Sequence, residues 1–91
     1  MQIARILGTT TPATTGTATA STDEGAHFVM LQNSGSTLRE VVIQTEQNGT
    51  SIANLYLAAG ERIIISKKPS EVIFAAHAEV KLTKVDPMKV N

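Results

Sequence analysis

Short apolar runs separated by turn residues mark the chain from residue 26 onward. Residues 26–32 form a continuous apolar run, which predicts a central strand covered on both faces. Further strands are predicted at residues 38–45, 52–57, 61–66, 71–74 and 78–85. No segment keeps a 3.6-residue apolar period, so helix content should be minor.

Turn residues separate these runs and predict how the strands connect. Asn48 and Gly49 favour the positive φ angles of a tight type I′ turn, so a hairpin should join residues 38–45 to residues 52–57. Gly60 can adopt the left-handed conformation of a tight reversal. Pro69 cannot donate to a strand ladder, which predicts a break there.

The clearest alternation of apolar and polar residues lies near the C-terminal end of the sequence. Val80 and Leu82 are predicted to face a core. Glu79, Lys81 and Thr83 occupy the opposite positions and are predicted to face solvent or a partner.

The segment before residue 26 has a different composition. Residues 2–7 are a short apolar stretch, and residues 9–22 are rich in threonine with one proline and one glycine. Small polar residues cannot bury enough surface to fold alone, so this segment is either a disordered tail or loop, or an extended arm against a neighbouring strand or subunit. We expect the arm. Its predicted partner-contacting residues are Thr9, Thr10, Thr11, Pro12, Thr14 and Thr15.

These elements predict an all-β fold. Seven to eight short strands joined by turns fit a small antiparallel β-sandwich or a jelly-roll-like barrel with an extended N-terminal arm. The arm with its first strand should occupy residues 1–25 and the β-sandwich domain residues 26–91. Such folds have edge strands, which can pair with another chain.

Composition narrows the kinds of partner and the source of stability. A chain of 91 residues without cysteine has no disulfide to support its small core, so partner subunits are the expected support. Its formal charge is zero and its aromatic content is 3%, which argues against nucleic acid as a partner. No apolar run approaches the ~20 residues that span a bilayer, and no signal peptide is recognisable, so neither membrane association nor export is expected.

Candidate reactive groups are few. His27 and His77 could bind a metal together with Glu79, but their spacing matches no recurrent metal-binding motif, and the favoured interpretation is structural. No nucleophile motif or phosphate-binding loop is present. Lys67 and Lys68 are interpreted as a solvated turn rather than a basic patch. We therefore expect no enzyme activity, no catalytic residues, no metal and no cofactor.

Two segments resemble small virion proteins of tailed bacteriophages, particularly those of marine and cyanobacterial hosts. The first is residues 57–76, LAAGERIIISKKPSEVIFAA, in which a small-residue turn with Gly-Glu leads to a β-branched strand, a lysine-containing turn and a strand headed by glutamate. The second is residues 3–10, IARILGTT. The resemblance implies a non-enzymatic, β-rich structural protein, often trimeric, that sits over junctions between capsid subunits.

The function implied is therefore capsid decoration or cement: binding major capsid protein subunits, or another virion protein, on particles assembled in the bacterial cytoplasm. Two alternatives remain open. One is a structural component of the neck, tail or fibre of the same virion. The other is a small carbohydrate- or receptor-binding module, in which Tyr56 is the one plausible stacking ring.

Overall fold

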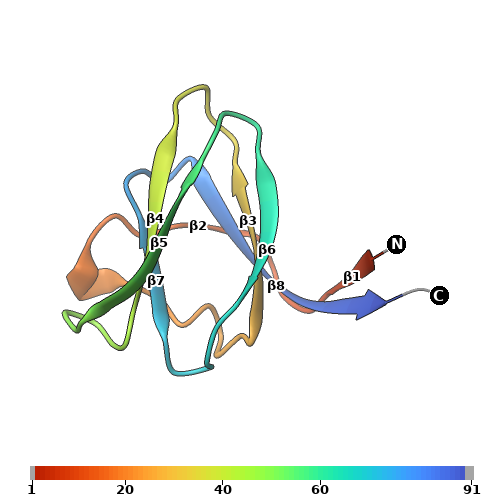
Figure 1. Ribbon diagram of the computed structural model, residues 1–91, viewed down its shortest axis with the longest axis horizontal. Helices are drawn as coiled ribbons and strands as arrows, with labels where there is room; N and C mark the ends of the chain where they lie inside the picture. The colour runs from red at the N-terminus through yellow and green to blue at the C-terminus, as the bar shows by residue number, and fades with distance from the viewer. Residues whose placement is uncertain (1, 90–91) are drawn as a thin grey trace.

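The protein is a sandwich of two antiparallel sheets (Figure 1). A computed structural model describes residues 2–89, with side chains described for residues 4–86. The first sheet contains β1 (Gln2–Ile6), β2 (Thr11–Pro12), β3 (Phe28–Asn33), β6 (Arg62–Ser66) and β8 (Val80–Lys89). The second contains β4 (Arg39–Gln44), β5 (Ser51–Leu57) and β7 (Val72–Ala75). A short 3-10 helix, η1 (Thr17–Thr19), precedes β3.

Strand order places β8 and β3 inside the first sheet and β4 at the centre of the second. In the first sheet the order is β1-β8-β3-β6, with β2 also paired to β8, and in the second it is β5-β4-β7. Strands make up 49% of the chain, well above the 20–25% typical of soluble domains. The predicted all-β sandwich is confirmed, and the described residues contain eight strands.

The core lies between the two sheets and consists of aliphatic side chains. Alternate residues of β3 are fully buried, including Val29 and Leu31, whereas Phe28 and Met30 on its outer face are half-buried. The predicted central position of this strand is confirmed, but its outer face is only partly covered. The core is completed by Ala13, Ala26, Val41, Ile43, Leu57, Ile73, Ala75, Val80 and Leu82.

The predicted hairpin of β4 and β5 is present, but the predicted turn type is wrong. The two strands pair antiparallel as far as Gln44 and Ser51, with a register shift that leaves Ile52 unpaired. A type I′ turn needs positive φ at two successive residues. Only Asn48 has positive φ here, 56°, and Gly49 N donates to Glu46 O at 2.9 Å. The connection is therefore a longer loop that contains a tight turn.

The predicted left-handed conformation of Gly60 is confirmed, because its φ is +75° in the turn between β5 and β6. Val80 and Leu82 are buried as predicted. Thr83 was expected to face solvent or a partner and is instead buried. Its hydroxyl lies 2.7 Å from the hydroxyl of Thr10, so the threonine-rich segment of the same chain covers it.

Beyond the sandwich, β1 pairs with the far end of β8, from Ile6 opposite Val85 to Gln2 opposite Lys89. Figure 1 shows these two strands leaving the body of the molecule together as a ribbon. Ile6 and Leu7, at its base, are exposed. No helix within residues 2–89 is long and apolar enough to cross a membrane.

Candidate functional site

The threonine-rich arm lies along both sheets and joins them on one side. Thr11 and Pro12 pair with Leu82 and Lys81 of β8, and Ala13 N donates to Val80 O at 2.8 Å. The chain then crosses to the second sheet, where Thr14 O accepts a bond from Ala75 N of β7. Residues 2–25 thus contribute β1 and β2 to the same sandwich as the rest of the chain.

Further along the arm, a second contact with β7 completes the closure. Ser21 and Ile73 exchange two backbone hydrogen bonds, at 3.0 and 2.8 Å. The loop between β4 and β5 holds the arm between these points, because Asn48 N donates to Thr17 O and Gln47 Nε2 donates to Ala20 O. Among the predicted partner-contacting residues, Thr14 is half-buried. The side chains of the others are exposed: Thr9, Thr10, Thr11, Pro12 and Thr15.

The arm therefore bonds to outward backbone groups of both β7 and β8 on this side. In antiparallel pairs, residues alternate between bonding to one neighbour strand and bonding to the other. Ile73 and Ala75 on β7 and Val80 and Lys84 on β8 all have outward groups bonded to residues 7–21. What remains for a partner on this side is the row of exposed side chains.

The opposite side of the sandwich is open, because β5 and β6 are edge strands that have no further neighbour among residues 2–89. Two bonds fix which backbone groups of β6 point away from β3. Lys67 N donates to His27 O at 2.8 Å and Asn33 N donates to Glu61 O at 2.9 Å, so odd-numbered residues of β6 bond to β3. The amide and carbonyl groups of Arg62, Ile64 and Ser66 consequently face outward, and no bond to them is found within residues 2–89.

The same alternation identifies the outward groups of β5. Ala76 N donates to Glu40 O at 2.9 Å, so even-numbered residues of β4 bond to β7 and odd-numbered ones bond to β5. On β5, the backbone amide and carbonyl groups of Asn54 and Tyr56 therefore point away from β4. The large apolar side chains Ile52, Tyr56 and Ile63 are exposed along these two edges.

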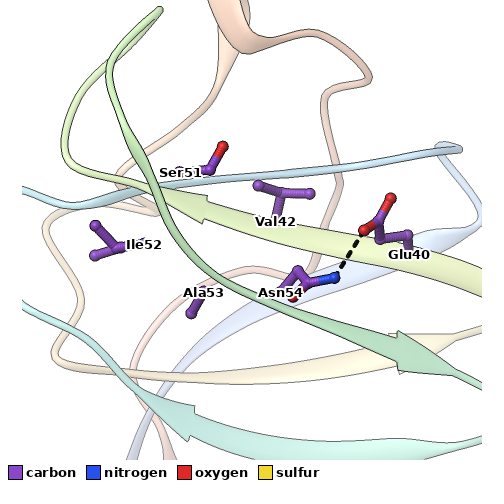
Figure 2. A pocket seen from close by; sticks show the side chains of 6 residues that line it. All are labelled: Glu40, Val42, Ser51, Ile52, Ala53 and Asn54. Carbon is purple, nitrogen blue, oxygen red and sulfur yellow. Dashed lines mark hydrogen bonds between the residues drawn. The ribbon is translucent and has the colours of Figure 1, made fainter.

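A shallow pocket of about 300 Å³ lies on the outer face of the second sheet (Figure 2). It is lined by Glu40, Val42, Ser51, Ile52, Ala53 and Asn54. Asn54 Nδ2 donates to Glu40 Oε2 at 2.9 Å across it. Tyr56 is the neighbour of Glu40 across the two strands and is 59% exposed, so a ring stands beside these polar groups.

At one end of the core, a buried acid and a buried lysine lie near each other. Asp23 and Lys67 are both buried, and Asp23 Oδ2 accepts no hydrogen bond from the described residues. Burial raises the pKa of Asp23, the charge of Glu24 raises it further, and Lys67 and Lys84 oppose the rise. Burial likewise lowers the pKa of Lys67, against the attraction of Asp23 and Glu71.

This acid lies in a turn with an unusual backbone. Asp23, Glu24 and Gly25 have φ angles of 52°, 62° and 70° in succession. For residues other than glycine this left-handed conformation costs roughly 1–2 kcal/mol each. Two side-chain acceptors hold the turn, because Ser21 Oγ accepts from Asp23 N at 2.9 Å and Thr22 Oγ1 accepts from Gly25 N at 3.2 Å.

The two histidines lie apart, at opposite ends of the ladder that β3 forms with β8. His27 directly precedes β3, whereas the carbonyl of His77 accepts a bond from Val80 N at the other end. His77 Nδ1 lies 3.9 Å from Glu79 Oε2, which also accepts a bond from Arg39 Nε at 3.2 Å. Within residues 2–89, no three acidic, histidine or cysteine residues are grouped so that they could hold a metal ion.

Compared with known proteins, the chain matches no family model, no curated protein and no solved structure.

Proposed function

We propose that this chain is a structural protein of a tailed-bacteriophage particle, a decoration or cement protein that stabilises the head by binding major capsid protein subunits. The observation that carries the proposal is the contrast between the two sides of the sandwich. One side is closed by the chain's own arm, and the other presents the unpaired edges of β5 and β6. Open edges are natural sites for contacts between chains.

Two further points support an assembly role in the virion. The sequence resemblance to small phage virion proteins covers β6 and β7 with their flanking turns, within residues 57–76. In addition, the exposed side chains of the arm form a row of small polar groups over β8 and β7. Each such contact is weak, but many copies bound to a symmetric lattice gain affinity through avidity.

The test measures binding of the purified chain to heads of the phage that encodes it, prepared without the chain. Thr11→Glu with Thr15→Glu places charges on the exposed face of the arm and leaves the backbone pairing with β8 intact. We expect wild-type protein to sediment with the heads and the double variant to lose occupancy at least tenfold. Ser70→Glu, in the exposed turn before β7, is the matched control and should bind normally.

Absence of the wild-type chain from these heads would contradict the proposal, and density at the neck or tail of the intact particle would assign it to those structures instead. Equal occupancy of the double variant would remove the arm from the interface. Deleting residues 1–20 is not a clean test, because the arm completes the edges of β7 and β8.

A second candidate function, carbohydrate binding, is favoured by one specific feature. Tyr56 stands exposed beside the pocket that contains Glu40 and Asn54, and a ring next to a carboxylate and an amide can stack on and hydrogen-bond to a sugar. Binding on a glycan array that is lost in Tyr56→Ala and retained in Ile52→Ala would support this function. An array without binding would exclude it for the glycans tested.

A further inference from the structure

The outward edge of β6 is complementary to itself. Its outward-facing residues, Arg62, Ile64 and Ser66, are spaced evenly about Ile64. If a second copy approaches antiparallel with Ile64 opposite Ile64, then Arg62 lies opposite Ser66 on both sides of the two-fold axis. All three residues then form hydrogen-bonded pairs, which gives about six hydrogen bonds between the copies.

Charge favours this register over the one centred on Arg62. The register centred on Ile64 places Arg62 of each copy opposite an uncharged serine. Shifting the centre to Arg62 would set two arginines opposite each other, which is destabilising. The register centred on Ile64 therefore satisfies the outward groups and avoids like charges.

Burial of apolar side chains also favours the register centred on Ile64. Ile63 and Ile65 are opposite Leu31 and Val29 of β3, so they lie on the core side of the sheet. Ile63 is 44% exposed because no strand within residues 2–89 covers it at this edge. In the two-fold arrangement Ile63 of one copy neighbours Ile65 of the other, which extends the core across the junction.

The open edge of β5, on the same side of the sandwich, is less suited to pairing. The register shift beside Ile43 and Gln44 leaves an extra residue, Ile52, on β5, and such bulges bend a strand and interrupt pairing. β6 pairs with β3 without a register shift and has no proline. Its one charged side chain, Arg62, is not on the core face.

We propose that the chain forms a two-fold symmetric homodimer in which β6 pairs antiparallel with β6 of a second copy, centred on Ile64. The first sheets of the two copies then become one continuous sheet. This inference does not depend on a role in the virion, and it specifies a dimer where the sequence resemblance implied a trimer.

The first test is the solution mass of the full chain across a concentration series, by light scattering and sedimentation. We expect two copies of the 9.7 kDa chain, with dissociation in the micromolar range because the interface is small. Ile64→Pro removes an amide that points outward, so it leaves the bonds to β3 intact while blocking the partner strand. Ile64→Pro should raise the dissociation constant of the dimer at least tenfold. Asn54→Pro, the matched change on the edge of β5, should leave it unchanged.

The second test does not require proline to be tolerated. The chain contains no cysteine, so Ile64→Cys introduces a single thiol. Residues in a hydrogen-bonded pair have Cα atoms about 5.5 Å apart, within the roughly 4.4–6.8 Å that a disulfide spans. Ile64→Cys should therefore form a disulfide-linked dimer on mild oxidation. Ser66→Cys should not, because two copies of residue 66 would lie ~14 Å apart.

A wild-type chain that stays monomeric up to about 1 mM, or that forms a trimer, would overturn the proposal. So would a dimer that survives Ile64→Pro, or equal cross-linking of the two cysteine variants.

Discussion

Asn33 fixes the end of β3 through hydrogen bonds from a fully buried amide. Its Nδ2 donates to Thr37 O at 2.7 Å and to Leu57 O at 3.0 Å, and its Oδ1 accepts from Gly35 N at 3.0 Å. The side chain thereby joins β3 to the loop before β4 and to the end of β5. A residue whose type favours turns is here a buried link between the two sheets.

Asn33→Ala should lower the free energy of unfolding by about 2–3 kcal/mol, since hydrogen bonds contribute ~1 kcal/mol each and buried partners would be left unsatisfied. Chemical denaturation measures this directly. Ser34→Ala removes a hydroxyl that donates to Glu79 O from an exposed position and is the control, with an expected loss under about 1 kcal/mol. A similar loss in both variants would contradict the importance of the buried amide.

Because of Asp23, the free energy of unfolding should decrease as the pH rises through the acid range. Its pKa is raised above 3.8, so the folded state binds the proton more tightly than the unfolded state does. The stabilisation is complete below pH 3.8 and is lost as the pH rises through the raised pKa. Asp23→Asn, which carries no charge to desolvate, should melt at or above the wild-type temperature at pH 7 and lack this decline.

Thermal melts of the wild type and of Asp23→Asn across the acid range measure this difference in melting temperature. Lys67 has an effect at alkaline pH. Because its pKa is lowered, the free energy of unfolding rises with pH from that pKa up to 10.5. Identical acid profiles for wild type and Asp23→Asn would show that Asp23 is not the group responsible.

The arm is the element that covers β7 and β8 on one side of the sandwich, and one of its short contacts is the 2.8 Å bond from Ala13 N to Val80 O. Ala13 is also buried in the core. Ala13→Pro removes this donor and should cost about 3 kcal/mol or more, with aggregation as the edge of β8 opens. Thr15→Pro, at an exposed position, is the control and should be milder. Light scattering during thermal unfolding distinguishes the two outcomes.

Strand positions could be predicted because alternation and turn residues are local signals. The predicted run at residues 61–66 became β6 (Arg62–Ser66), and residues 71–74 became β7 (Val72–Ala75). The burial of Thr83 could not be predicted, since its cover, Thr10, is distant in sequence.

The open side of the sandwich could not be predicted either. A strand's sequence does not reveal whether it has one neighbour or two, and this depends on the strand order of the whole molecule. The buried positions of Asp23 and Lys67 were hidden for a similar reason, because both residues belong to polar turn segments. The arm was predicted to be extended, and whether its exposed side chains bind a partner remains a prediction.

Taken as a whole, the molecule buries its core within one chain. It exposes 5268 Å², close to the roughly 5,100 Å² that scaling predicts for a monomer of this mass. The small size of the core led us to expect support from partner subunits. Such contacts would add stability to a chain whose core is already buried without them. A monomeric Ile64→Pro variant is expected to stay folded for the same reason.

Amide hydrogen exchange across the whole molecule should distinguish the two sides. The amides of Ile73 and Ala75 are bonded to the arm and should exchange slowly. Asn54 and Tyr56 should exchange quickly in every form. Ile64 and Ser66 should be protected in the proposed dimer and should lose protection on dilution to monomer. Equal protection of Asn54 and Ile64 in the dimer would be inconsistent with pairing through β6.

The pairing of the arm with β8 also constrains the order in which the chain can fold. Thr11 lies opposite Leu82, about seventy residues later, so the β2 part of the arm has no partner strand until β8 has been synthesised. Such non-local pairing slows folding, typically to milliseconds or seconds. Until then the first sheet lacks the strand that links β3 to β1 and β2. Chaperone contact or premature association should therefore be greatest in the interval before β8 leaves the ribosome.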